Sequence, residues 1–160
     1  MKIAVTGHTG LLGRNIYSMF DTSEHTVIGM SRTTGFNLET DYHTCIQILK
    51  TCDIVFNNAH AGTVQARIIQ DLVETNNIVI TSGSEAANYD IDQYCLDKCF
   101  IHSVYYQCRQ YYPNRCLLLK MGYLNENHQN LTPINIQEIL NGIQLFLSNR
   151  RITMIEYLNI

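Results

Sequence analysis

The sequence predicts an α/β fold, with one doubly wound parallel sheet of about seven strands and helices on both of its faces. Three observations support this prediction. Short apolar runs of strand length alternate with segments of helical periodicity along the 160 residues. The first run leads directly into a turn with glycines at positions 7, 10 and 13. No repeat, low-complexity stretch or linker interrupts this order, so we expect residues 1–160 to form one domain without a separate substrate domain.

The expected elements follow one another in a regular order. Strands should fall near residues 2–6, 26–31, 35–38, 53–57, 77–82, 116–121 and 152–158. Helices should fill roughly residues 11–21, 41–50, 63–75, 92–111 and 134–148. Parallel neighbours need a long crossover that is usually a helix, so this alternation favours helices on both faces of the sheet.

The first and last helices show the clearest apolar stripes, and we expect both stripes to face the sheet. For the last helix we expect Thr132 as the N-terminal cap and Pro133 in the first turn. The stripe residues of the first helix are Leu12, Ile16, Met19 and Phe20, and those of the last are Ile136, Ile139, Leu140, Ile143 and Phe146.

The turn after the first strand has the composition of a phosphate-binding loop. Gly7 and Gly10 leave room for a sharp turn and for a pyrophosphate to approach the backbone. The helix that follows presents unpaired amides and a dipole that favours negative charge. Gly13 would let this helix pack against the strand. The segment therefore predicts a Rossmann-type dinucleotide site, whose turn also contains Thr9, Leu11 and Leu12.

The residues after the second strand indicate which dinucleotide is bound. A free ribose hydroxyl is usually met here by Asp or Glu, and neither is present. Ser31, Arg32 and Thr33 instead offer a positive charge and hydroxyl groups to a ribose phosphate. We therefore expect NADP as cofactor, with NADPH preferred over NADH. Asn37 and Leu38 are candidates to flank the adenine.

A possible proton donor lies on the expected helix 92–111. Tyr94 and Lys98 are four residues apart and share one helix face. An ammonium group near a phenol stabilises the phenolate, which makes tyrosine a usable acid or base toward a carbonyl or alcohol oxygen. A serine hydroxyl at the end of the adjoining strand could hold the same oxygen. Ser82 is the candidate for this role, with Ser84 and Thr81 as rivals.

Taken in this order, the motifs resemble those of the short-chain dehydrogenase/reductase family. The resemblance spans nearly the whole chain, and four motifs in the right order are far more specific than one. The matching residues are Thr6-Gly7-His8-Thr9-Gly10-Leu11-Leu12-Gly13, Asn57-Asn58-Ala59-His60, Ser82 and Tyr94-Cys95-Leu96-Asp97-Lys98.

The resemblance implies a role for each of these motifs. The glycine turn would bind the dinucleotide pyrophosphate, and Asn58 and Ala59 would line the nicotinamide side, where His60 ends the same motif. Tyr94 would be the catalytic acid/base and Ser82 its helper. Lys98 would also hold the nicotinamide ribose. In reduction, NADPH would deliver hydride to a carbonyl carbon of a small-molecule substrate while Tyr94 protonates the oxygen.

Three departures from the family pattern bear on the site. His60 stands where glycine usually closes the motif, and its side chain is either simply accommodated or takes part in proton transfer. The expected helix 63–75 contains no asparagine to match the family's proton relay, although Asn76 and Asn77 follow it. Only residues 121–132 separate the sixth strand from the last helix, so we expect an open site. Its candidate border residues are Tyr89, Tyr123 and His128.

Composition narrows the partners. A formal net charge of −3 without a basic block argues against nucleic-acid binding. No apolar run approaches the roughly 18 residues of a membrane span, and the chain starts in a strand, so we expect a cytoplasmic protein without a membrane partner. The six cysteines form no CxxC pair, which predicts free, mostly buried thiols and no metal. Aromatic residues on more than one side of helix 92–111, together with the family likeness, favour a homodimer or homotetramer.

Three functions fit these observations. The first is an NADP(H)-dependent carbonyl reductase or alcohol dehydrogenase that uses Tyr94, Lys98 and Ser82. The second is a dinucleotide-binding sensor or scaffold with little catalysis. The third is a nucleotide-sugar epimerase or reductase, because the glycine spacing resembles the extended group of the family.

Overall fold

The computed structural model describes residues 1–88, 92–122, 124, 134–152 and 154–157. In this part of the chain six strands form one parallel sheet with the order β2-β1-β3-β4-β5-β6. The strand order therefore reverses at β1: β2 is added on one side of β1, and β3 to β6 are added in turn on its other side. The strands are β1 (Lys2–Thr6), β2 (Thr26–Met30), β3 (Ile54–Asn57), β4 (Ile78–Ser82), β5 (Cys116–Met121) and β6 (Met154–Tyr157).

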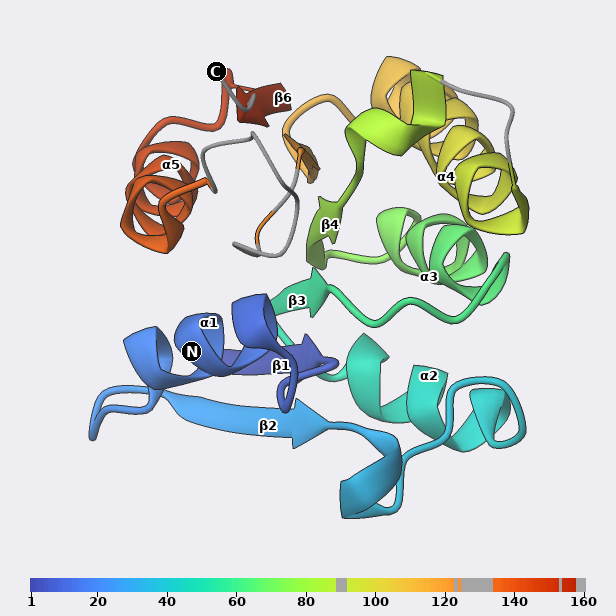
Figure 1. Cartoon of the computed structure of the whole chain (residues 1–160). Coiled ribbons are helices and arrows are strands. Elements are labelled where there is room, and N and C mark those ends of the chain that lie inside the picture. Colours follow the sequence, from blue (N-terminus) through green and yellow to red (C-terminus); the bar gives the residue numbers. More distant parts are fainter. Residues whose placement is uncertain (89–91, 123, 125–133, 153, 158–160) are drawn as a thin grey trace.

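Helices cover both faces of the sheet, as the sequence predicts (Figure 1). On one face lie α1 (Leu11–Phe20) and α5 (Ile136–Ser148), and on the other lie α2 (Tyr42–Lys50), α3 (Val64–Val73) and α4 (Gln93–Tyr111). Side chains alternate along each strand, so β1 sends Ile3 and Val5 into the core under α1 and α5 and Ala4 into the opposite core. The doubly wound α/β fold is confirmed.

The strand expected at residues 35–38 is not formed. A short 3₁₀ helix, Arg32–Thr34, follows β2 instead, and Gly35 ends it in the left-handed conformation with φ of 84°. The side chain of Asn37 then accepts a hydrogen bond from the Glu39 amide at 3.1 Å, which turns the chain toward α2. These local turns prevent the extended backbone that a seventh strand requires, so β2 forms the edge of the sheet.

The apolar stripes of the first and last helices face the sheet, as expected. Leu12, Ile16 and Phe20 are buried in α1, and Ile139, Ile143 and Phe146 are buried in α5. The prediction of the α5 cap was wrong. Asn135 is the cap, because its side chain accepts a hydrogen bond from the Gln137 amide at 2.9 Å. Residues 132 and 133, where the cap and first turn were expected, lie outside the described residues.

The structure also describes the cysteines, the possible metal ligands and the hydrophobicity of the helices. All six cysteines are free thiols, and four of them, Cys45, Cys52, Cys95 and Cys116, are buried. Within the described part of the chain, no cluster of three His, Cys, Asp or Glu side chains is placed to hold a metal ion. No helix among those residues is long and apolar enough to span a membrane.

Candidate functional site

The carboxyl ends of β1 to β4 meet at one edge of the sheet, beside the point where the strand order reverses. Two adjoining pockets open there. The larger pocket has a volume of about 340 Å³ and lies between the glycine turn and the segment after β2. The smaller pocket has a volume of about 170 Å³ and is lined by residues that follow β4 and by α4. Asn58 and His60 line both pockets, so these two residues mark the junction.

The glycine turn is packed too tightly for side chains at two of its positions. Gly7 has a φ of 66°, and a Cβ there would lie 3.0 Å from the Ala59 backbone. A Cβ at Gly13 would lie 2.1 Å from the Gly7 carbonyl oxygen, so this glycine lets α1 pack against the turn. A Cβ at Gly10 would lie 3.4 Å from the Gly7 carbonyl oxygen, which is an ordinary contact distance, and Gly10 lines the larger pocket.

The start of α1 can accept an anion. Gly10 is its N-cap residue and supplies no side-chain hydrogen bond, and the first turn contains no acidic residue. The amides of Leu11 and Leu12 in that turn therefore have no intrahelical acceptor and no competing carboxylate. Together with the pocket that Gly10 lines, these residues fit the pyrophosphate of a dinucleotide.

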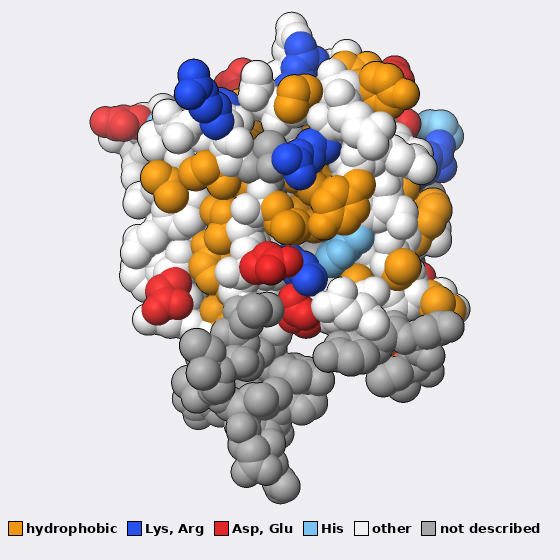
Figure 2. Space-filling model, turned by 90° about the horizontal axis from the view of Figure 1, so that it is seen from above, with side chains coloured by type: hydrophobic (Ala, Val, Ile, Leu, Met, Phe, Trp, Pro, Cys, Tyr) orange, Lys and Arg blue, Asp and Glu red, His pale blue; other side chains and the backbone are white. Residues whose placement is uncertain are grey.

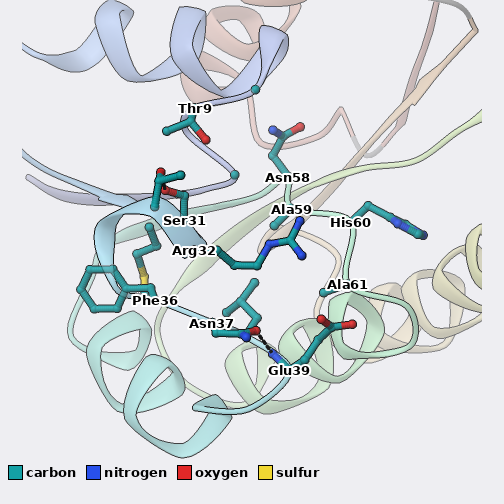
Figure 3. Close-up of a pocket in the computed structure, with 15 residues that line it drawn as sticks. Thr9, Ser31, Arg32, Phe36, Asn37, Glu39, Asn58, Ala59, His60 and Ala61 are labelled. Atoms are coloured by element: carbon teal, nitrogen blue, oxygen red, sulfur yellow. Dashed lines mark hydrogen bonds between the residues drawn. The ribbon is translucent and has the colours of Figure 1, made fainter.

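The segment after β2 forms the other wall of the larger pocket. The hydroxyl groups of Ser31 and Thr33 form a hydrogen bond of 2.8 Å. Both residues line the pocket, together with Arg32. Figure 3 shows Arg32 extending into the space between Asn37 and the Ala59–Ala61 segment. Arg32, Ser31 and Thr33 thus share one wall of the pocket, as the sequence predicts.

Of the other residues in this wall, the sequence predicts two and misses two. Asn37 and Leu38 line the larger pocket, as expected for residues that flank an adenine. Phe36 and Glu39 also line it and were not singled out from the sequence. In the sequence, the only signal for Phe36 and Glu39 is their position beside Asn37 and Leu38.

Thr6, the last residue of β1, holds the junction between the pockets. Its side-chain oxygen accepts hydrogen bonds from the Asn58 amide at 2.9 Å and the Ala59 amide at 3.0 Å. The same hydroxyl lies 3.3 Å from the Phe56 carbonyl, to which it donates. Thr6 thereby fixes the backbone after β3 against the glycine turn.

Tyr94, Lys98 and Ser82 come together in the smaller pocket, as the sequence predicts. The Lys98 ammonium lies 5.5 Å from the centroid of the Tyr94 ring. Lys98 is only 3% exposed, whereas Tyr94 is 41% exposed. Burial lowers the pKa of Lys98 to about 8, and the neighbouring Asp97 carboxylate partly opposes this shift.

The structure separates the three hydroxyl candidates at the end of β4. Ser82 and Ser84 both line the smaller pocket, whereas Thr81 is not among its described lining residues and is buried beside Asn57. The Ser84 amide donates to Nε2 of His102 at 3.3 Å. Burial, followed by the nearby lysines, lowers the pKa of His102 to about 4, so its ring stays neutral and can accept this bond.

Gln65 in α3 was missed by sequence reasoning. It is fully buried, and its Oε1 accepts a hydrogen bond from the Lys98 ammonium at 3.0 Å. Its Nε2 donates to Ser82 Oγ at 3.1 Å and to the Asn57 carbonyl at 2.8 Å. A search for asparagine in residues 63–75 overlooks this glutamine, although it carries the same amide group. Asn77 instead donates to the carbonyls of Leu49 and Cys52, on the α2 side of the sheet.

His60 lines the larger pocket, and its ring extends away from Arg32 in Figure 3. Its Nε2 lies 3.4 Å from a carboxylate oxygen of Asp97, and its ring centroid lies 5.0 Å from that of Tyr94. Asp97 is 6% exposed and also accepts a hydrogen bond from Gln93 at 2.8 Å. The histidine is therefore accommodated by turning toward α4, and its place beside Tyr94 is compatible with proton transfer. Sequence reasoning missed Asp97 as its partner.

The other described residues that line the smaller pocket are Leu12 in α1, Gly83 after β4, and Met121, Gly122 and Leu124 at and after the end of β5. Tyr89, Tyr123 and His128, which were expected to border the substrate site, lie outside the described residues.

Comparisons with solved structures show the same fold. A dTDP-4-dehydrorhamnose reductase from Clostridium acetobutylicum matches with a TM-score of 0.75 and 11% identity over 98% of this chain and 74% of that one. A UDP-N-acetylglucosamine 4-epimerase from Bacillus cereus matches with a TM-score of 0.71 and 14% identity over 98% and 75%. An alcohol dehydrogenase from the archaeon Thermococcus sibiricus, complexed with 5-hydroxy-NADP, matches with a TM-score of 0.65 and 11% identity over 99% and 95%.

Sequence comparison is more specific than these structural likenesses. No curated protein sequence matches the chain significantly. The family model described as "NAD dependent epimerase/dehydratase family" matches residues 3–83, which include the glycine turn, the Arg32 segment and Ser82. The chain therefore belongs to the NAD-dependent epimerase/dehydratase family, within the extended short-chain dehydrogenase/reductase superfamily.

Proposed function

We propose that the protein is an NADP(H)-dependent oxidoreductase that transfers hydride between the nicotinamide and a small carbonyl or alcohol substrate. One observation carries the proposal. The larger pocket, with its glycine turn and Arg32, meets the smaller pocket, with Tyr94 and Lys98, at Asn58 and His60. A cofactor site and an acid/base group thus share one continuous edge of the sheet.

The larger pocket would hold the cofactor through groups of different kinds. A bound NADPH supplies the hydride. Backbone amides at the start of α1 would bind the pyrophosphate, and Arg32 with Ser31 and Thr33 would bind the ribose phosphate. Asn37 and Leu38 would flank the adenine. At the junction, Asn58, Ala59 and His60 would line the nicotinamide side.

In the smaller pocket Tyr94 would act as the acid/base. Its hydroxyl gives a proton to the substrate oxygen during reduction and takes one back during alcohol oxidation. The Lys98 ammonium, 5.5 Å from the ring centroid, would stabilise the negative charge left on the Tyr94 oxygen when the proton leaves. Because the pKa of Lys98 is lowered only to about 8, the lysine keeps its charge at neutral pH. Ser82 would donate a hydrogen bond to the same substrate oxygen.

The direct test is Tyr94→Phe, assayed with NADPH and a panel of small aldehydes and ketones. We expect wild-type turnover, a fall in kcat of about 10²- to 10⁴-fold in the variant, and unchanged NADPH binding. Tyr111→Phe is the matched control, since Tyr111 ends the same helix and is 78% exposed. A variant as active as wild type would contradict the role of Tyr94, and a wild-type protein that turns over no carbonyl compound would contradict the function.

Two alternative functions predict different results in binding and turnover experiments. A nucleotide-sugar reductase or epimerase is favoured by the family match and by the names of two structural neighbours, a dTDP-4-dehydrorhamnose reductase and a UDP-N-acetylglucosamine 4-epimerase. Saturable binding of a UDP- or dTDP-sugar would support it. A dinucleotide sensor or scaffold would bind NADPH and show no substrate-dependent oxidation.

We further propose that the protein forms a homodimer or homotetramer through α4. Leu96, Phe100, Tyr106 and Tyr111 are large apolar side chains of this helix that stay exposed. Over the β6 edge of the sheet, apolar side chains gather between charges of both signs (Figure 2). Light scattering should give a mass at least twice that of the 18.4 kDa chain, and Phe100→Asp should reduce it. A monomeric wild-type mass at micromolar concentration would contradict this assembly.

A further inference from the structure

Gln65 connects three parts of the smaller pocket without lining it. The side chain comes from the first turn of α3 and reaches the ends of β3 and β4 as well as α4. Gln65 is fully buried and is absent from the described lining of both pockets. It therefore has no direct route to cofactor or substrate, and any effect on them must pass through its neighbours.

The hydrogen bonds of Gln65 define the orientation of its amide. Nε2 donates to the Asn57 carbonyl at 2.8 Å and to the Ser82 carbonyl and Oγ at 3.1 Å each. Oε1 faces the Lys98 ammonium at 3.0 Å. Exchanging the two ends would place an NH₂ group against an ammonium and an oxygen against two carbonyls. The two hydrogens of the NH₂ group are shared among these three oxygens, and only this orientation sets donors against acceptors throughout.

This orientation limits what Lys98 and Ser82 can do. An ammonium carries three hydrogens, and Gln65 Oε1 and the Ser82 carbonyl, at 3.2 Å, accept two of them. One hydrogen of Lys98 is left. The Ser82 hydroxyl accepts from Gln65 and keeps its own hydrogen, which it donates to the Asn58 carbonyl across 3.5 Å. That long contact leaves the hydroxyl free to donate to a better acceptor in the pocket.

We propose that Gln65 is the positioning residue of the smaller pocket: its amide holds the Lys98 ammonium and the Ser82 hydroxyl so that each presents its remaining hydrogen to the pocket. As a catalytic role this rests on the proposed function. The link between Gln65 and Lys98 is a property of the chain alone and can be measured without cofactor or substrate.

Lys98 can report on this link directly. Among the described residues, the other titratable groups around it are Asp97, Tyr94 and His102 on α4 and His60 after β3, and the Gln65 variants keep all four side chains. The chain contains four lysines, so ¹³Cε-lysine labelling gives a simple spectrum. The Lys98 signal is identified by its loss in Lys98→Arg.

We expect opposite shifts from two substitutions of Gln65 in the protein without cofactor. Wild-type Lys98 should titrate near pH 8. Gln65→Glu places a carboxylate against the ammonium and should raise this midpoint by at least about one pH unit. Gln65→Met removes the acceptor and should lower the midpoint by roughly half a unit or more, and Gln65→Asn, which keeps an amide, should restore part of that loss.

Gln70→Glu and Gln70→Met are the matched controls, because Gln70 is an exposed glutamine of the same helix. They should move the Lys98 midpoint by less than about 0.2 pH unit. An unchanged midpoint in the Gln65 variants would overturn the proposal. Should Gln65→Met fail to fold, Gln65→Glu alone decides, since a rise supports the link and no shift contradicts it.

Kinetics then separate positioning from general destabilisation. Gln65→Met should lower kcat by about tenfold or more and change the Kd for NADPH by less than about threefold. Equal kcat in Gln65→Met and wild type would overturn the catalytic part of the proposal. If wild type turns over no carbonyl compound while the opposite midpoint shifts are seen, the proposed function fails and the positioning of Lys98 by Gln65 is supported.

Discussion

The larger and the smaller pocket share one edge of the sheet and are built from different kinds of group. The larger pocket uses backbone geometry, in the glycine turn, and exposed side chains such as Arg32. The smaller pocket uses buried polar side chains, chiefly Gln65, Ser82 and Lys98, which bind one another. The first arrangement binds through local conformation, and the second depends on contacts between elements far apart in the sequence.

This difference predicts how each pocket responds to change. Backbone geometry is set by a few glycines, so a single Cβ can block binding and leave the rest of the molecule intact. A buried polar network couples its members, so removing one group leaves the others unpaired and changes their protonation.

The largest expected effect separates binding from folding within the glycine turn. Gly10→Val places a branched side chain in the larger pocket before α1 and should weaken NADPH binding by about a hundredfold with little loss of stability, because a Cβ at Gly10 meets only the Gly7 carbonyl oxygen, at 3.4 Å. Gly13→Ala should instead lower the free energy of unfolding by roughly 3 kcal/mol, because its Cβ would lie 2.1 Å from the Gly7 carbonyl oxygen. Urea unfolding and calorimetry distinguish the two, and equal NADPH affinity in Gly10→Val and wild type would exclude this turn as the phosphate site.

A smaller effect is expected at the wall after β2. Arg32→Ala should reduce the affinity for NADPH by about tenfold and leave that for NADH nearly unchanged, because only NADPH carries the ribose phosphate. Glu39→Gln is the control, since Glu39 lines the same pocket and carries no positive charge. Fluorescence titration with both nucleotides gives the two affinities, and parallel losses for NADPH and NADH would contradict the role of Arg32.

Lys98 gives the buried network a pH signature. Because burial lowers its pKa to about 8, the folded protein binds fewer protons than the unfolded chain between this value and the ordinary pKa of 10.5. Burying the charged Lys98 ammonium destabilises the folded protein, and this cost is fully present below pH 8. It disappears as Lys98 loses its proton at higher pH, so the free energy of unfolding should rise by up to ~1 kcal/mol per pH unit in that window. Urea unfolding at several pH values measures this gain. Lys98→Met should lack it, and an equal slope in both proteins would assign it to other groups.

The smallest effect is expected where the two pockets meet. Asp97→Asn removes the negative partner of His60, whose Nε2 lies 3.4 Å away, and should lower kcat by roughly three- to tenfold with cofactor affinity unchanged. His60→Gln should have a similar effect, and the double variant should add little, because the two side chains act as a pair. Additive losses would show that the residues act independently.

Sequence reasoning succeeded where a local pattern determines the structure. Alternating apolar runs gave six strands of the sheet, and the spacing of Tyr94 and Lys98 placed both in the smaller pocket. It failed at residues 35–38, where the apolar residues Phe36 and Leu38 suggested a strand. There the left-handed conformation of Gly35 and the hydrogen bond from the Glu39 amide to the Asn37 side chain stabilise turns. The strand propensity of only four residues is too weak to compete with these turns.

The contacts that complete the site were out of reach for a physical reason. Gln65 meets Lys98 and Ser82 across 33 and 17 positions of sequence, and Thr6 meets Asn58 across 52. No periodicity or spacing rule relates residues so far apart, because the packing of separate helices and strands brings them together. Asp97 lies between Tyr94 and Lys98 in the sequence, and only the turn of the loop after β3 shows that it faces His60.

The central claim is that the larger pocket binds a phosphorylated dinucleotide, and calorimetric titration of the purified protein with NADPH and NADH tests it most directly. We expect saturable binding of both nucleotides at one site per chain, with NADPH bound about tenfold more tightly. Binding of neither nucleotide would contradict the account, because the glycine turn, Arg32 and the junction at Asn58 would then share a fold with dinucleotide-binding proteins without their ligand.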